Sequence, residues 1–172
     1  MVFVVPNSVD FVILHFAILA NAAISVPVDA NTIDRNLNVI VEQTEPVFIV
    51  IADKIYDRFD TSDYRTELLS EVVSSKNTES NNFNVTDKGF LKKNDNDLAV
   101  ILYTSGSTGI PKGVKLTNRN TLTTQRNIIN FCKYSSLSFE VVTLPLSHSF
   151  GLGQLYAMLF MGGGAFLETG ML

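Results

Sequence analysis

The chain has 172 residues, of which 46% are hydrophobic and 17% charged, and its formal net charge is -4. This composition is typical of a globular domain with a sizeable buried core, and it excludes a disordered chain. An acidic balance without a clustered basic surface also argues against nucleic acid as a partner. Cys132 is the sole cysteine, so no disulfide framework is expected, and a reducing, cytoplasmic location is predicted.

The first residues predict a buried strand, Val2 to Val5, and then an apolar helix that runs to about Ala23. Asn7 or Ser8 is expected to cap this helix, because short polar side chains accept hydrogen bonds from the first free backbone N–H groups. His15 lies inside the apolar helix, where a structural role is expected.

The helix from Phe11 to Ala20 is apolar enough to raise the question of a signal peptide or a membrane span. No Lys or Arg precedes Arg35, however, and a signal peptide begins with a basic stretch. Polar residues also interrupt any run of 20 residues in this region. The sequence therefore predicts a core helix and no transmembrane segment.

The elements expected next alternate in type. They are a strand from Ile24 to Val28, a helix opened by Thr32, a strand from Val47 to Ala52 and a helix from Tyr64 to Val73. The unbroken apolar run from Val47 to Ala52 is typical of a parallel strand that is covered on both faces. Residues 74–97 are polar and rich in asparagine, and they are predicted to form a surface insertion within the domain.

Beyond the insertion, the same alternation resumes. We expect strands at Leu98 to Tyr103, Val114 to Leu116, Val141 to Leu144 and Ala165 to Leu167, with a helix from Asn118 to about Lys133 and another from Gly151 to Met161. Alternating strands and helices predict an α/β fold, layered, with a largely parallel sheet and flanking helices. Gly151 and Gly153 are expected to let the last helix pack closely.

The segment YTSGSTGIPKG, from Tyr103 to Gly113, carries the strongest chemical signal. Four hydroxyl side chains lie within five residues, the glycines permit positive φ and a close approach of the backbone to a ligand, and Lys112 adds a cation. Hydroxyl groups, backbone N–H groups and one ammonium form a cradle for an anion such as a polyphosphate. The phosphate-binding residues proposed from this pattern are Thr104, Ser105, Gly106, Ser107, Thr108, Gly109 and Lys112.

This segment has two competing interpretations. A cluster of Ser, Thr and Gly is also typical of a plain surface turn, but the ordered Pro111-Lys112-Gly113 behind the glycines favours a specific loop. A Walker A loop requires Gly-Lys-Ser/Thr at the start of a helix. Here Lys112 precedes Gly113 and a short strand is expected to follow, so an ordinary P-loop NTPase is excluded.

The loop resembles the signature of the adenylate-forming (AMP-binding) superfamily, which includes acyl-CoA synthetases, peptide-synthetase adenylation domains and luciferases. Two more segments resemble that family in order and spacing, FVILHFAILANAAISVPVD from Phe11 to Asp29 and LPLSHSFGLG from Leu144 to Gly153. The departures are Asn21, where the family has a glycine-containing turn, and Asn118, where it commonly has His. Neither position touches the phosphate chemistry.

The resemblance implies that residues 1–172 are a partial N-terminal domain, and that the C-terminal domain with its catalytic Lys is absent. It implies ATP-dependent activation of a small-molecule carboxylate to an acyl-adenylate, with Mg²⁺ as a cofactor whose ligand residue is missing from this chain, and coenzyme A as the acceptor. By the same resemblance, His148, Phe150 and Gly151 are expected to border the substrate pocket. The alternatives are an amino-acid adenylation domain of a peptide synthetase, or a non-catalytic fragment or nucleotide-binding module.

Overall fold

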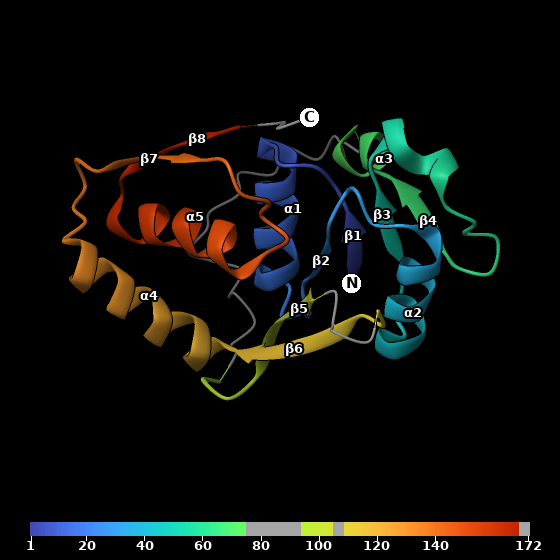
Figure 1. The fold of residues 1–172 in the computed structure, drawn as a ribbon, viewed down its shortest axis with the longest axis horizontal. Coiled ribbons are helices and arrows are strands. Elements are labelled where there is room, and N and C mark those ends of the chain that lie inside the picture. The colour runs from blue at the N-terminus through green and yellow to red at the C-terminus, as the bar shows by residue number, and fades with distance from the viewer. Residues whose placement is uncertain (75–93, 105–108, 169–172) are drawn as a thin grey trace, which may run out of the picture.

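The computed structural model describes residues 1–74, 94–104 and 109–168, and these form a sequence of strands and helices (Figure 1). The elements in chain order are β1 (Val2–Val4), α1 (Val9–Ala20), β2 (Val26–Val28), α2 (Asp34–Thr44), β3 (Ile49–Ile51), η1 (Asp53–Arg58), β4 (Thr66–Leu68), α3 (Leu69–Ser74), β5 (Leu98–Thr104), β6 (Lys112–Thr117), α4 (Asn118–Cys132), β7 (Phe139–Val142), α5 (Ser149–Met161) and β8 (Gly164–Leu167). The fold is α/β with a mainly parallel sheet flanked by helices, as predicted.

The main sheet has four parallel strands in the order β2-β1-β3-β4. All three residues of its central strand β1 are buried. Successive side chains of a strand point to opposite faces, so β1 is covered on both faces. Phe3 packs with the core of α1 and α5, whereas Val2 and Val4 pack with the core of α2. Two helical layers therefore cover the sheet, which explains why its strands read as continuous apolar runs.

The hairpin of β5 and β6 extends from the β2 edge of this sheet. Ser25, just before β2, makes an isolated parallel bridge with Val100 of β5. The Ser25 N–H donates to the Ala99 carbonyl at 2.9 Å, and the Ile101 N–H donates to the Ser25 carbonyl at 3.0 Å. β5 itself pairs with β6 in the antiparallel direction. The backbone hydrogen bonds that connect the β5–β6 hairpin to the main sheet are thus those of Ser25.

The C-terminal part of the described chain adds α4, α5 and a parallel pair of strands, β7 and β8. Figure 1 shows α5 beside α1 and beneath the β7–β8 pair, with α4 running below α5 from the end of β6. Leu152, Leu155 and Tyr156 of α5 belong to the same core as α1. In the part of the chain that the structure describes, no helix has the length and apolarity needed to cross a membrane.

Three expectations about individual elements were wrong. The segment from Tyr64 to Leu68 is not the start of a helix, because Thr66–Leu68 pairs with β3 as an edge strand and only the residues after it are helical. The cap of α4 is Thr117, one residue earlier than expected, with a reciprocal hydrogen bond from its backbone to Asn120. The strand expected at Val141 to Leu144 ends at Val142. The predicted insertion at residues 74–97 lies largely outside the described residues.

Candidate functional site

The predicted phosphate-binding loop lies at the tip of the β5–β6 hairpin. Thr104, the last residue of β5, is paired across the hairpin with Lys112, the first residue of β6. Lys112 was expected to belong to an irregular loop, so the regular pairing at this position is a correction. The two ends of the loop are held side by side by backbone hydrogen bonds of a sheet.

The two described glycines of the loop have different roles. Gly109 has a φ of +73° and an open surrounding, which agrees with the expected need for positive φ. Gly113 does not have positive φ; it lies where a Cβ atom would be 2.9 Å from Cγ2 of Ile101 and 3.0 Å from Cζ of Tyr103. Gly113 is therefore required for the close packing of β6 on the side chains of β5.

Lys112 is exposed, and within the described ranges it forms no ion pair. An ammonium group without a protein carboxylate as its partner keeps its charge available for an anionic ligand. Of the other residues proposed for this loop, Ser105, Gly106, Ser107 and Thr108 lie outside the described residues. Their phosphate-binding roles stay predictions.

A cavity of about 310 Å³ lies beside the hairpin. It collects residues from three distant parts of the sequence, namely the end of β2 with the start of α2, the β5–β6 hairpin, and the turn before α5. Its walls include Asp29, Tyr103, Thr104, Ser147 and His148. The structure thus brings Thr104 and His148, both predicted site residues, to one cavity.

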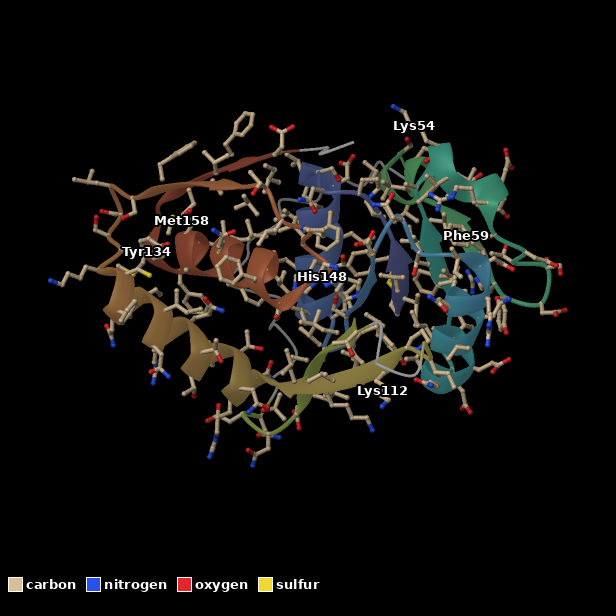
Figure 2. The ribbon with its side chains drawn as sticks, viewed as in Figure 1. Lys54, Phe59, Lys112, Tyr134, His148 and Met158 are labelled. Atoms are coloured by element: carbon tan, nitrogen blue, oxygen red, sulfur yellow. The ribbon has the colours of Figure 1, made fainter. Side chains whose placement is uncertain are left out.

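His148, the N-cap residue of α5, lines this cavity, and it is labelled near the centre of Figure 2. Its Nε2 atom lies 3.3 Å from Oδ2 of Asp29, and its side chain is 52% exposed. Asp29 Oδ1 in turn accepts a hydrogen bond of 2.7 Å from the Asn31 N–H. The carboxylate of Asp29 therefore favours one orientation of the imidazole, and about half of the His148 side chain remains accessible.

Sequence reasoning missed Asn7 as a positioning residue. The Asn7 side chain donates to the carbonyl of Leu144 at 3.0 Å and to that of Glu168 at 3.4 Å, and its Oδ1 accepts from the Leu146 N–H at 2.8 Å. Ser8, and not Asn7, caps α1. Asn7 fixes the backbone that leads to His148. No local pattern signals a contact between residues so far apart in sequence.

Phe150 and Gly151 lie away from the 310 Å³ cavity. The Phe150 side chain is 66% exposed. A Cβ atom on Gly151 would lie 2.5 Å from the carbonyl oxygen of Pro145 and 2.7 Å from that of Leu144. This is the close helix packing expected of Gly151; a role for either residue in a substrate pocket stays a prediction.

His15 has the expected structural environment. It is fully buried, with Nδ1 at 2.7 Å from the Ser25 hydroxyl and Nε2 at 2.6 Å from the Tyr156 hydroxyl. Burial lowers the pKa of His15 from 6.5 to about 4 and raises the pKa of Tyr156. The two hydroxyl groups satisfy a neutral imidazole, so His15 ties α1 to α5 and to the strand lead-in at Ser25.

A bound Mg²⁺ ion needs oxygen ligands, usually including one or two carboxylates. No group of three or more His, Cys, Asp or Glu side chains gathers within residues 1–74, 94–104 and 109–168. Asp29, the carboxylate in the cavity wall, is occupied by Asn31 and His148. The described residues therefore do not form a magnesium site by themselves.

Comparison with known proteins identifies the family. The family model described as "AMP-binding enzyme" matches residues 1–170, and the chain therefore belongs to the AMP-binding enzyme family. The relatives include trichosetin synthetase PKS-NRPS1 of Gibberella fujikuroi, which is 32% identical over 94% of this chain and 4% of that protein. They also include 4-coumarate–CoA ligase-like 9 of Arabidopsis thaliana, 27% identical over 91% of this chain and 29% of that protein.

Solved structures show the same fold. ATP-bound MatB of Rhodopseudomonas palustris superposes with a TM-score of 0.82 at 19% identity, over 97% of this chain and 34% of that chain. A long-chain-fatty-acid-CoA ligase of Archaeoglobus fulgidus gives a TM-score of 0.80 at 26% identity, over 96% of this chain and 34% of that chain. The chain spans 4% and 29% of the two relatives named above and 34% of each of the two solved structures.

Proposed function

We propose that this chain supplies the phosphate-binding and acid-binding part of a ligase that activates a carboxylic acid with ATP. The observation that carries the proposal is the cavity that brings Thr104 and His148 together beside the hairpin of Lys112, which forms no ion pair with any described residue. One wall can hold phosphate oxygens, and the other is formed by an imidazole that a carboxylate orients. Membership of the AMP-binding enzyme family supports ATP-dependent acid activation as the reaction of this site.

In the proposed reaction, an oxygen of the substrate carboxylate attacks the α-phosphorus of ATP. The bond from that phosphorus to the oxygen bridging the β-phosphate breaks, pyrophosphate leaves with the bonding electrons, and an acyl-adenylate remains. Both reactants are anionic, so the protein has to place donors and cations where negative charge accumulates. Thr104 and Lys112, with the loop between them, hold the phosphates that become pyrophosphate.

His148 lies at the acid end of the same cavity. Its Nε2 atom lies 3.3 Å from Oδ2 of Asp29, and this contact favours one orientation of the ring. An imidazole fixed in this way can border the acid and keep it beside the α-phosphate, which lowers the entropic cost of reaction. No residue of this chain is proposed as a covalent nucleophile, and Mg²⁺ would neutralise phosphate charge when bound.

We propose coenzyme A as the acceptor of the acyl group, with cytoplasm as the location. In that step the thiolate attacks the acyl carbonyl and AMP leaves. An amino-acid adenylation domain that delivers to a carrier protein is an equally supported alternative, because relatives of both kinds match the chain. A non-catalytic nucleotide-binding module is the remaining alternative from another class.

Acid-dependent exchange of labelled pyrophosphate into ATP tests the activity. The exchange is measured on the longest open reading frame that contains these residues, with fatty, aryl and amino acids as candidate substrates. Exchange with an aryl or fatty acid, followed by thioester formation with coenzyme A, is the expected result. Exchange with amino acids alone favours the peptide-synthetase alternative, and no exchange with any acid contradicts the proposed activity.

A further inference from the structure

One wall of the cavity of about 310 Å³ is the turn of residues 29–32, between β2 and α2. Asp29, Asn31 and Thr32 of this turn line the cavity. The Thr32 N–H donates to the Asp29 carbonyl at 2.9 Å, and the Asn31 N–H donates to Asp29 Oδ1 at 2.7 Å. The turn belongs to no helix or strand, so the hydrogen bonds of regular structure do not fix its position.

Arg58, the last residue of η1, binds this turn although it does not line the cavity. Its Nη1 atom donates to the Ala30 carbonyl at 2.8 Å, and its Nη2 atom donates to the Thr32 carbonyl at 3.2 Å. These two carbonyls flank Asn31. A guanidinium group is a planar, rigid fork of donors, whereas a Lys ammonium is a point donor. Arg58 therefore holds the turn on both sides of Asn31.

The backbone of Arg58 is itself anchored in the core. Phe59, the next residue, is buried and is labelled in Figure 2. It belongs to the same core as Val28, the residue that precedes the turn. The Cζ atom of Arg58 lies 5.6 Å from the centroid of the Phe59 ring, and Arg58 forms no ion pair with any described residue. The core that packs against β2 thus also anchors the residue that binds the turn after β2.

The turn connects Arg58 to the candidate site through Asp29. Oδ2 of Asp29 lies 3.3 Å from Nε2 of His148, and Oδ1 of the same carboxylate accepts the hydrogen bond from the Asn31 N–H. Because the Asn31 N–H is part of the turn, a displacement of the turn would move the Asp29 carboxylate relative to the His148 ring. The position of the turn therefore bears on the orientation of the imidazole.

We propose that Arg58 is a positioning residue of the candidate site. Its guanidinium holds the turn of residues 29–32, and through Asp29 it favours the orientation in which His148 borders the acid. This inference rests on the proposed function, since it assigns a role within the same site. Arg58 touches neither ATP nor the acid; it reduces the number of positions that one wall of the cavity can adopt.

The ring signals of histidine in NMR spectra test this role without ATP or an acid. The 172-residue protein contains two histidines, and His148→Gln shows which signals belong to each. Asp29→Asn defines the His148 signals without the carboxylate partner. In Arg58→Ala, the His148 signals should move most of the way toward those of Asp29→Asn, while the His15 signals stay in place. If either Asp29→Asn or Arg58→Ala leaves the His148 signals unchanged, the proposal is overturned.

Arg65 supplies the matched control. Its Cζ atom lies 5.8 Å from the centroid of the Phe48 ring, which is the same kind of ring contact that Arg58 makes. Its side chain is hydrogen-bonded to Glu67 and not to the turn. Arg65→Ala should therefore leave the signals of both histidines in place. A shift of the His148 signals as large as that in Arg58→Ala would show that the effect is not specific to the turn, and would overturn the proposal.

Arg58→Lys separates the geometry of the side chain from its charge. The variant keeps the positive charge and loses the fork, and it carries the test if Arg58→Ala does not fold. A single ammonium group cannot hold both carbonyls in the same way, so the His148 signals should move in the same direction as in Arg58→Ala. His148 signals at the wild-type position would show that charge alone suffices, and would contradict the proposed role of the fork.

A second measurement applies to an enzyme that contains these residues and is active in pyrophosphate exchange. Arg58→Ala should raise the KM for the acid by about 3- to 10-fold and leave the KM for ATP unchanged, because Lys112 and its hairpin stay in place. An unchanged KM for the acid overturns the proposal. The NMR result does not depend on activity, so the expected NMR shifts together with no exchange in the wild type would contradict the ligase activity alone.

Discussion

His15 Nε2 and the Tyr156 hydroxyl lie 2.6 Å apart in the core, although 141 positions separate the two residues in the sequence. The contact joins α1 to α5. Because the Ser25 hydroxyl occupies the other ring nitrogen, the imidazole has a polar partner on each side. The neutral ring fits this environment, and a charged ring does not, because burial disfavours the charged form.

We expect the free energy of unfolding to decrease as the pH is lowered, because of His15. Its folded pKa of about 4 lies below the unfolded value of 6.5, so between these values the unfolded chain binds a proton that the folded chain does not. The stabilisation is complete above pH 6.5 and is lost as the pH falls toward 4, amounting to about 3 kcal/mol over that range. Urea unfolding at a series of pH values measures the slope, and His15→Gln should reduce it.

An exposed amide of α4 supplies the control for this experiment. Asn130 has no titratable side chain. Asn130→Ala should therefore keep the wild-type slope between pH 4 and 6.5. The explanation fails if His15→Gln has the same slope as the wild type, whatever its stability at neutral pH.

Two glycines of α5 give a matched pair. Gly151→Ala would place a methyl group 2.5 Å from the carbonyl oxygen of Pro145, which is backbone and cannot rotate away. We expect the free energy of unfolding to fall by about 1–3 kcal/mol. Gly153→Ala meets only side chains at 3.8 Å or more, and should leave stability unchanged or raise it by up to about 1 kcal/mol. Thermal unfolding of both variants checks the difference; equal effects would contradict it.

Asn7→Ala removes three hydrogen bonds, to Leu144, Leu146 and Glu168, that hold the segment before His148. The free energy of unfolding should fall by about 1–3 kcal/mol. Asn38, whose side chain makes a single long bond of 3.4 Å to Asp34, serves as the control. Asn38→Ala should cost about 0.5 kcal/mol or less. Chemical denaturation compares the two, and an equal loss in both would refute a special role for Asn7.

Lys112→Ala should lower the rate of pyrophosphate exchange by about 10- to 100-fold, since one charge-assisted contact to the departing pyrophosphate is lost. The measurement uses an active enzyme that contains these residues. Lys115, three positions along the same strand and also exposed, is the control, and Lys115→Ala should keep most of the activity. A folded Lys112→Ala enzyme with the wild-type rate would remove Lys112 from the proposed site.

The 172-residue protein by itself should give little or no pyrophosphate exchange. Contacts from an exposed loop to phosphate are screened by water and salt, and adenylate formation needs a closed site that excludes water. The assay covers fatty, aryl and amino acids, with an active relative as the positive control. Strong exchange with any acid would show that the residues of this chain suffice.

Much of the fold follows from local sequence patterns. The apolar runs at β1, β3 and β5 predict buried strands, because a strand covered on both faces has no polar alternation. The strand β4 was missed because Thr66–Leu68 is short and half-buried, and its conformation is set by pairing with β3. The predicted N-cap of α4 was one residue too late because Thr117 and Asn118 are both favourable N-cap residues. The reciprocal hydrogen bonds between Thr117 and Asn120 decide between them.

The candidate site was predicted in part. Thr104 and Lys112 were found because a loop motif is contiguous in sequence. Asp29 and Asn7 were missed, since their contacts join residues more than 100 positions apart. A single sequence gives no signal for such pairs, because they arise only after the helices have packed against the sheet.

The register of the β5–β6 hairpin also determines the direction in which Lys112 points. Successive residues of a strand face opposite sides, so a slip of one position would turn the ammonium to the other face of the hairpin. Such a slip would also place Lys112 or Val114 where Gly113 now lies, against Ile101 and Tyr103, and neither side chain fits there. Gly113 thus fixes the register of the hairpin because it has no side chain. That register in turn determines the face of the hairpin on which the Lys112 ammonium lies.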